Sequence, residues 1–190
     1  MRIVLATGNR DKVRELERLL DGAVVEAAPE GFDPDETGTS LLQNAWIKAA
    51  ALRDDAPADA LVMADDSGLF VHALNGRPGV HSSRYAGPDA TYADNCDLLL
   101  TELGEGTDRA AAFGCVLVGL APDGDMLVAS GVLPGEITRE AAGDEGFGYD
   151  PVFRPLSDER TLAQMTQGEK ATISHRGRAG RAMAHLLGFA

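Results

Sequence analysis

Residues 61–68 read LVMADDSG, in which four apolar residues precede Asp65, Asp66, Ser67 and Gly68. Successive side chains of a strand point to opposite faces, so two adjacent carboxylates cannot both reach water from a covered sheet. We therefore expect the strand to end at residue 64 and to release both carboxylates at its C-terminal edge, where open α/β sheets hold their ligands. The alternative is a simple polar turn, because Asp-Ser-Gly is common in turns.

The spacing of apolar residues indicates strands that alternate with helices. We expect strands over residues 1–6, 24–27, 61–64 and 69–74, and a long hairpin formed by residues 110–121 and 126–138. We expect helices between Asn9 and Gly22 and over residues 41–53, 90–103, 158–166 and 175–187. Asn9, Ser40 or Thr39, and Ser174 stand where N-caps are expected. This order predicts one α/β domain over residues 1–190.

The composition is that of a globular protein, with 44% hydrophobic and 25% charged residues. No apolar run approaches the ~18 residues that cross a bilayer, and the segment MRIVLATGNR lacks the features of a signal peptide. We therefore expect a cytoplasmic protein that does not contact membranes. A net charge of −13 disfavours binding to nucleic acid. Cys96 and Cys115 are expected to be buried thiols.

The 17 basic residues include only three lysines, Lys12, Lys48 and Lys170. A lysine ammonium is a compact charge suited to phosphate oxygens, although chance placement is the alternative. The first lysine ends a segment made of Thr7, Gly8, Asn9, Arg10, Asp11 and Lys12. A strand, a glycine turn and a helix N-terminus meet there, and backbone N–H groups and the helix dipole favour an anion at such a place.

Acidic residues supply candidate metal ligands. Glu36 and the Asp65-Asp66 pair fit Mg²⁺, which takes a few carboxylates together with water and phosphate oxygens. A solvated loop charge is the alternative for Glu36. Further along, residues 146–151 read GFGYDP, with Phe147, Gly148, Tyr149 and Asp150 in one short loop.

An aromatic ring of this loop could stack on a base, and Asp150 could accept hydrogen bonds from ring N–H groups. A tight turn plugged by hydrophobic side chains is the alternative. His175 and Arg176, which follow Lys170, place cations at the start of a helix, where the macrodipole disfavours them. That local conflict indicates a function.

Five motifs in order cover nearly the whole chain: ATGNRDKVRELERLL; ETG with QNAWIKA; MADDSGLFV with GRPGVHSSRYAG; GFGYDPVF; and EKATISHRGRA. In these motifs the chain resembles the inosine/xanthosine triphosphate pyrophosphatase family. The resemblance implies an elongated, twisted, mixed β-sheet flanked by helices, with an active-site cleft between a main body and a smaller lobe. It also implies a homodimer that hydrolyses inosine, deoxyinosine and xanthosine triphosphates to the monophosphate and pyrophosphate.

The resemblance also assigns roles to the candidate residues. It implies that residues 7–12 and Lys48 contact the triphosphate, that Glu36 and Asp66 bind Mg²⁺, and that Asp66 is the proton acceptor, with Ser67 beside the substrate. The implied set for base recognition and phosphate contact consists of Phe147, Gly148, Tyr149, Asp150, Lys170, His175 and Arg176. Gln43 stands where many members carry Glu, so we leave it out of the metal site.

Three other functions fit parts of the sequence. A pyrophosphatase of the related septum-inhibitor type is one, but the SHR and FGYDP motifs argue against it. A nucleotide sensor without catalysis would not need Glu36, Asp65 and Asp66. An acidic scaffold without a ligand would leave the placement of the lysines to chance.

Overall fold

The computed structural model describes residues 1–189 and contains two compact units. The first unit comprises residues 1–66 and 115–131 and the chain from residue 175 onward. The second unit comprises residues 67–114 and 132–174. The chain passes from one unit to the other within three long strands, β3 (Leu61–Val71), β5 (Ala110–Leu120) and β6 (Met126–Ile137).

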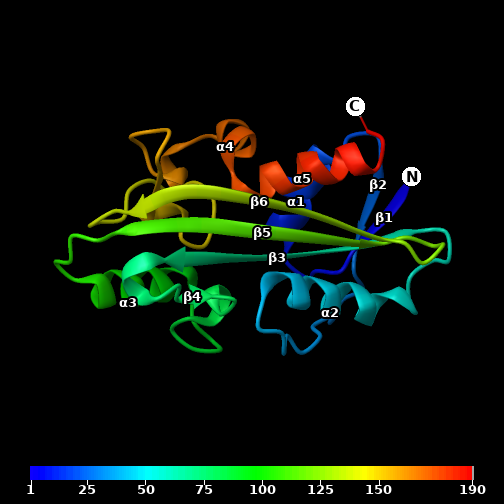
Figure 1. Cartoon of the computed structure of the whole chain (residues 1–190), viewed down its shortest axis with the longest axis horizontal. Helices are drawn as coiled ribbons and strands as arrows, with labels where there is room; N and C mark the ends of the chain where they lie inside the picture. The colour runs from blue at the N-terminus through cyan, green and yellow to red at the C-terminus, as the bar shows by residue number, and fades with distance from the viewer. Residues whose placement is uncertain (190) are drawn as a thin grey trace. The chain divides into compact units, whose positions relative to one another are not determined.

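The first unit is a sheet with helices on both faces (Figure 1). Strand β1 (Arg2–Leu5) pairs in parallel with β2 (Val24–Ala27) on one side and with the start of β3 on the other. Helices α1 (Arg10–Leu19) and α5 (His175–Leu186) lie side by side on one face, and α2 (Leu41–Arg53) covers the other. Each face has its own apolar core.

Close packing of α5 requires a glycine on β6. A Cβ atom on Gly131 would collide with the carbonyl oxygen of His175 and would lie 2.7 Å from the amide nitrogen of Ala179. Only a residue without a side chain therefore lets the first turn of α5 approach the sheet.

The second unit holds the remaining elements. Strand β4 (Pro78–Gly79) pairs antiparallel with β3, and β7 (Phe153–Pro155) pairs antiparallel with β6. The helices are α3 (Tyr92–Leu103) and α4 (Gln167–Ile173), with 3₁₀ turns η1 (His72–Leu74), η2 (Ser82–Arg84), η3 (Asp150–Val152) and η4 (Leu162–Gln164). Its core includes the rings of Phe113 and Phe153, whose centroids are 4.6 Å apart. The mixed sheet flanked by helices confirms the predicted fold class; the cleft and the single domain stay predictions.

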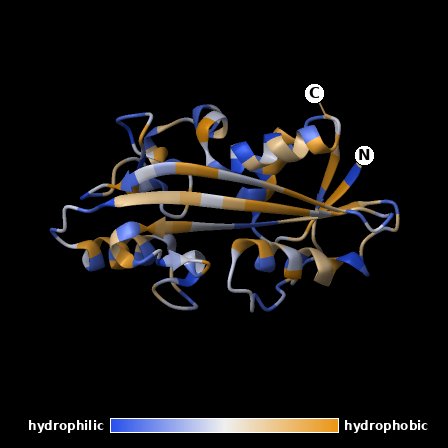
Figure 2. Cartoon of the chain, in the orientation of Figure 1, coloured by the Kyte–Doolittle hydropathy of each residue, from blue (hydrophilic) through white to orange (hydrophobic). Residues whose placement is uncertain are grey.

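The long strands are rich in apolar residues, as Figure 2 shows for β5 and β6. Three of the described helices begin at the N-caps Asn9, Ser40 and Thr91, whose side chains accept backbone hydrogen bonds. Two of these caps were predicted. None of the helices in residues 1–189 is both long and apolar enough to cross a membrane.

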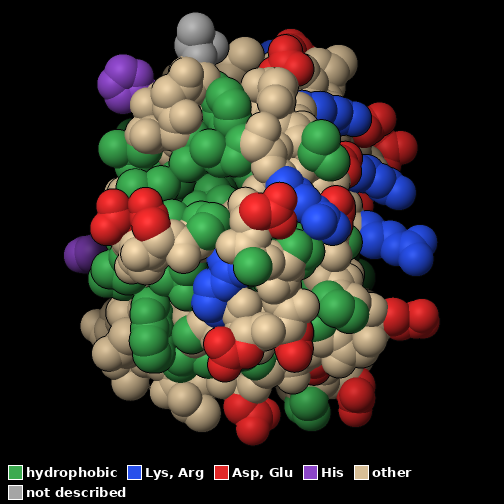
Figure 3. All heavy atoms as spheres, turned by 90° about the vertical axis from the view of Figure 1, so that its right-hand side faces the viewer, with side chains coloured by type: hydrophobic (Ala, Val, Ile, Leu, Met, Phe, Trp, Pro, Cys, Tyr) green, Lys and Arg blue, Asp and Glu red, His purple; other side chains and the backbone are tan. Residues whose placement is uncertain are grey.

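Part of the surface is apolar. Large apolar side chains exposed in the first unit include Met1, Val24, Met126 and Leu186. Figure 3 shows hydrophobic side chains forming a continuous strip on the face that lies to the right in Figure 1, where β1 and β2 are. A strip of this kind is typical of a surface that contacts another molecule.

Three sequence predictions of secondary structure are wrong. The strand expected over residues 69–74 is not a separate strand, because residues 69–71 belong to β3 and residues 72–74 form η1. The strand that begins at Leu61 does not end at residue 64, because β3 continues through Asp65 and Asp66 to Val71. The helix expected over residues 158–166 is replaced by turns, the short η4 and then α4. Thr161 and Thr166 each cap a separate element, which divides the expected helix.

Candidate functional site

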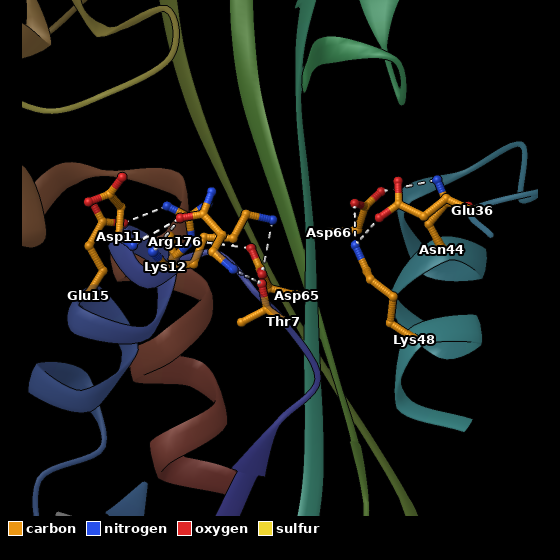
Figure 4. Close-up of polar contacts among 11 residues, drawn as sticks. Thr7, Asp11, Lys12, Glu15, Glu36, Asn44, Lys48, Asp65, Asp66 and Arg176 are labelled. Carbon is orange, nitrogen blue, oxygen red and sulfur yellow. Dashed lines mark hydrogen bonds and ion pairs between the residues drawn. The ribbon is translucent and has the colours of Figure 1, made fainter. Parts of the chain in front are cut away.

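The two adjacent aspartates point to opposite faces of β3 (Figure 4). Asp65 and Asp66 are only 1% and 5% exposed, so neither carboxylate is released into water as the sequence suggested. A carboxylate inside a strand needs a compensating charge, and the structure supplies cations on both faces. Those cations explain why the strand continues through residues that usually form turns.

On one face, Lys48 of α2 lies between two carboxylates. Its Nζ is 2.8 Å from Oδ1 of Asp66 and 2.7 Å from Oε1 of Glu36. The ammonium is buried, and the Glu36 side chain is 22% exposed. Two carboxylate oxygens therefore converge on one point, which is held by the Lys48 ammonium; the binding of Mg²⁺ by Glu36 and Asp66 stays a prediction.

Asn44 connects this cluster to the loop that carries Glu36. Its Oδ1 accepts a hydrogen bond from the Gly38 N–H at 2.8 Å, and its Nδ2 is 3.4 Å from Oδ2 of Asp66. Asn44 is completely buried. Gln43, one residue earlier, accepts hydrogen bonds from the backbone and hydroxyl of Thr39 at the start of α2.

Burial and charge shift the ionisation of this cluster. Burial raises the pKa of Asp66, and repulsion from Glu36 adds to the rise, while Lys48 acts in the opposite direction. Burial opposes the charged form of Lys48, but the carboxylates of Asp65, Asp66 and Glu36 together raise its pKa. Asp66 is thus a carboxylate that accepts a proton more readily than an ordinary aspartate.

On the other face, Asp65 pairs with two cations. Its Oδ1 is 3.1 Å from Nζ of Lys12, and its Oδ2 accepts a hydrogen bond from Nε of Arg176 at 3.2 Å. Arg176 also donates to Oε2 of Glu15 at 2.5 Å. Burial opposes ionisation of Asp65, but Lys12 and Arg176 outweigh it and hold the pKa of that carboxyl well below its usual range.

The segment of residues 7–12 joins β1 to α1. Three of its backbone N–H groups donate to its own side chains: that of Asn9 to the Thr7 hydroxyl, and those of Asp11 and Lys12 to Oδ1 of Asn9. An anion bound at these N–H groups would have to displace the cap, whereas the Lys12 ammonium already lies beside β3. Gly8 and Arg10 are exposed in this segment.

The second unit brings together three of the predicted residues. Oδ2 of Asp150 accepts hydrogen bonds from the Phe147 N–H at 2.9 Å and from Nζ of Lys170 at 2.7 Å. The Lys170 ammonium also lies 4.6 Å from the centroid of the Phe147 ring. A side chain at Gly146 would collide with the Asp150 carboxylate, so the loop closes around this pair only with glycine there.

The other predicted residues take different places. Tyr149 lies in the hydrophobic core and its hydroxyl donates to the carbonyl of Ser82 at 2.9 Å, whereas Phe147 is only half-buried. Ser67 follows Asp66 within β3 and is half-buried, as is Gly148. His175 is buried at the start of α5.

Two residues of the clusters were not among the predicted site residues, although the sequence places Asn44 on the same helix face as Lys48. Asn44 stands one helical turn before Lys48, so the i, i+4 spacing offered a signal for it. Glu15 offered none, because its partner Arg176 lies 161 positions away along the chain.

The cluster of Glu36, Lys48 and Asp66 can be tested for its fit to a divalent cation. No group of three or more acidic, histidine or cysteine residues that could hold a metal occurs in this range. Two converging carboxylates are nevertheless the protein ligands that a hard cation uses when water and phosphate oxygens complete its shell. The donor set therefore fits such an ion.

Comparisons with known proteins agree with the predicted resemblance. The sequence model of the Ham1 family matches residues 3–186. A dITP/XTP pyrophosphatase from Escherichia coli (strain K12) is 48% identical over 195 residues, which cover 98% of each chain.

Two solved structures are also similar. A Ham1 protein from Staphylococcus aureus has a TM-score of 0.89 and 38% identity, with 99% of this chain and 98% of that chain covered. A HAM1 protein from Coxiella burnetii has a TM-score of 0.86 and 40% identity, with all of both chains covered.

Proposed function

The chain belongs to the Ham1 family, and from that premise we propose that it hydrolyses purine nucleoside triphosphates outside the standard set. Its substrates would be inosine, deoxyinosine and xanthosine triphosphates, and its products the monophosphate and pyrophosphate. The observation that carries the proposal is Asp66, a buried carboxylate of raised pKa whose neighbours are Lys48 and a second carboxylate, Glu36. A proton acceptor, a cation and a metal ligand are the groups that phosphoryl chemistry needs.

In this mechanism Asp66 orients a water molecule toward the α-phosphorus and takes its proton. The raised pKa of Asp66 suits that role, since a general base acts best when its pKa approaches the working pH. Lys48 and Lys12 offset the charge on the triphosphate and on the departing pyrophosphate. Asn44 donates toward Oδ2 of Asp66, which would aim the carboxylate.

Glu36 and Asp66 would hold a divalent cation, and we propose Mg²⁺. When bound, it would neutralise charge on the phosphate oxygens. The support is that both carboxylates already converge on one positive group, the Lys48 ammonium.

Base recognition would belong to the cluster of Phe147, Asp150 and Lys170 in the second unit. The half-buried Phe147 ring could stack on any purine. The 6-oxo group and N1–H of inosine and xanthosine need a donor and an acceptor, whereas adenine presents a 6-amino donor and a bare N1. We therefore propose a pocket that rejects adenine by unmatched hydrogen bonds.

The proposed enzyme is a cytoplasmic homodimer of single-domain subunits. The apolar strip on the first unit supports a partner subunit, since such a strip is typical of contact surfaces. Light scattering coupled to size-exclusion chromatography tests the dimer, and a monomer at micromolar concentration would contradict it.

Product analysis in labelled water tests the proposed reaction. The chain is incubated with deoxyinosine triphosphate and Mg²⁺ in H₂¹⁸O, and the products are identified by ³¹P NMR and mass spectrometry. We expect monophosphate and pyrophosphate in equal amounts, with ¹⁸O in the monophosphate, because water attacks the α-phosphorus. Orthophosphate and a diphosphate, or ¹⁸O in the pyrophosphate, would overturn the proposal.

A further inference from the structure

Asp65 lies between two cations that belong to different helices. Lys12 comes from the first turn of α1 and Arg176 from the first turn of α5. One carboxylate oxygen faces each of them, at 3.1 Å and 3.2 Å. The Asp65 side chain is fully buried, and it leaves β3 on the face opposite Asp66, Glu36 and Lys48 (Figure 4).

The two cations differ in their surroundings. Arg176 has a second carboxylate partner in Glu15, and its side chain is 2% exposed. The Lys12 side chain is 18% exposed and follows the turn of residues 7–11. Lys12 is therefore the cation of this cluster that reaches the surface. The buried Asp65 carboxylate holds its ammonium in place through the ion pair.

We propose that Asp65 is a positioning residue, which holds the Lys12 ammonium where it contacts the triphosphate, and that it is not a ligand of the metal. The inference rests on the proposed function for its substrate. It assigns separate tasks to the adjacent aspartates: Asp66 acts on water at one face of β3, and Asp65 orders a phosphate-binding lysine at the other.

Removing the Asp65 charge has two opposing effects on triphosphate binding. The site becomes more positive by one charge, which favours a polyanion. However, Lys12 and Arg176 lie within 3.2 Å of the same carboxylate, and without it the two like charges repel each other at close range. The more exposed Lys12 would then swing into solvent. Water screens the added positive charge of the site more than it screens the buried repulsion between Lys12 and Arg176. We therefore expect the displacement of Lys12 to dominate the change in triphosphate binding.

The test is Asp65→Asn, which keeps the side-chain volume and an oxygen for Arg176. With deoxyinosine triphosphate we expect KM to rise about 10-fold or more, the range of one charge-assisted hydrogen bond, and kcat to change less. In a Lys12→Ala background the same substitution should have little further effect on KM. Binding of Mn²⁺ alone, followed by electron paramagnetic resonance, should remain as in the wild type.

Several results would overturn the proposal. These are an unchanged or lower KM, an effect that adds fully to that of Lys12→Ala, or weakened Mn²⁺ binding. Glu15→Gln is the matched control: it also removes a carboxylate bound to Arg176 but leaves the Lys12–Asp65 pair, so KM should not rise.

A second variant covers the case in which Asp65→Asn does not fold. Asp65→Glu keeps the charge for Arg176 but displaces the carboxylate from Lys12 by one methylene, so KM should again rise, and an unchanged KM would contradict the proposal. The two proposals fail differently. Wild-type protein that does not hydrolyse the triphosphate contradicts the proposed function, whereas active wild type with an unaffected Asp65→Asn contradicts only the role of Asp65.

Discussion

Replacing Lys48 by methionine should lower the free energy of unfolding and make that free energy depend on a divalent metal. The change removes the ammonium that lies 2.7 Å from Glu36 and 2.8 Å from Asp66 but keeps the apolar stem of the side chain. Removing one partner of a buried ion pair costs about 3–5 kcal/mol. Because the Glu36 side chain is 22% exposed, we expect the lower end, about 3 kcal/mol.

A bound metal should restore most of that loss. An ion present at about 100 times its dissociation constant stabilises the folded state by about 2.7 kcal/mol, which nearly equals the expected cost. A divalent cation would take the place of the ammonium between the two carboxylates. For a protein of this length, a loss of about 3 kcal/mol in the free energy of unfolding corresponds to a fall in Tm of about 10 °C.

Urea unfolding with and without MgCl₂ is the assay, and Arg53→Met is the control. Arg53 is a cation on the same helix, but it donates to the backbone carbonyls of Pro57, Ala60 and Leu120. Its loss should therefore destabilise the fold without any rescue by metal. Wild-type stability in Lys48→Met, or equal rescue of both variants by Mg²⁺, would refute the reasoning.

Three further predictions concern the clusters around Asp66, Asp65 and Lys170. Asp66→Asn should fold but lose about 10²- to 10⁴-fold in kcat, measured by pyrophosphate release; near-normal turnover would contradict its role as base. Lys12→Ala and Lys170→Ala should lower kcat/KM for the triphosphate far more than Arg14→Ala, because the Arg14 side chain is exposed. Equal effects of the three substitutions in steady-state kinetics would mean that the lysines are ordinary surface residues. The lowered pKa of Asp65 adds stability that is complete above its unfolded pKa of about 4 and is lost as the pH falls below it, by at most about 1.4 kcal/mol per pH unit. Urea midpoints should therefore fall more steeply for wild type than for Asp65→Asn between about pH 4 and pH 3, and parallel curves would contradict the assignment.

Local signals were enough to place most of the fold. Helix starts at Asn9 and Ser40 follow from side chains that accept backbone hydrogen bonds, and those can be read from the sequence. The end of β3 could not be read in this way. Asp-Ser-Gly favours a turn in isolation, and only Lys12, Arg176 and Lys48, supplied from distant segments, allow the strand to continue.

The site shows the same limit. Sequence alone proposed Glu36, Lys48 and Asp66 as parts of one chemistry, and the structure brings these three together. The sequence could not show that Asp65 faces away from that cluster. The predicted strand ended at residue 64, so the rule that successive strand side chains point to opposite faces was not applied to Asp65 and Asp66. Arg176 was predicted to contact the substrate, yet its visible partners are carboxylates of the protein itself.

Discrimination between inosine and adenosine triphosphate tests the central claim most directly. The measurement is kcat/KM for both nucleotides at saturating Mg²⁺, with xanthosine and guanosine triphosphates beside them. We predict the order inosine or xanthosine, then guanosine, then adenosine, with adenosine about 10⁴-fold below inosine because its 6-amino group and bare N1 leave buried partners unmatched. Comparable values for inosine and adenosine triphosphate would contradict both the base recognition and the proposed function.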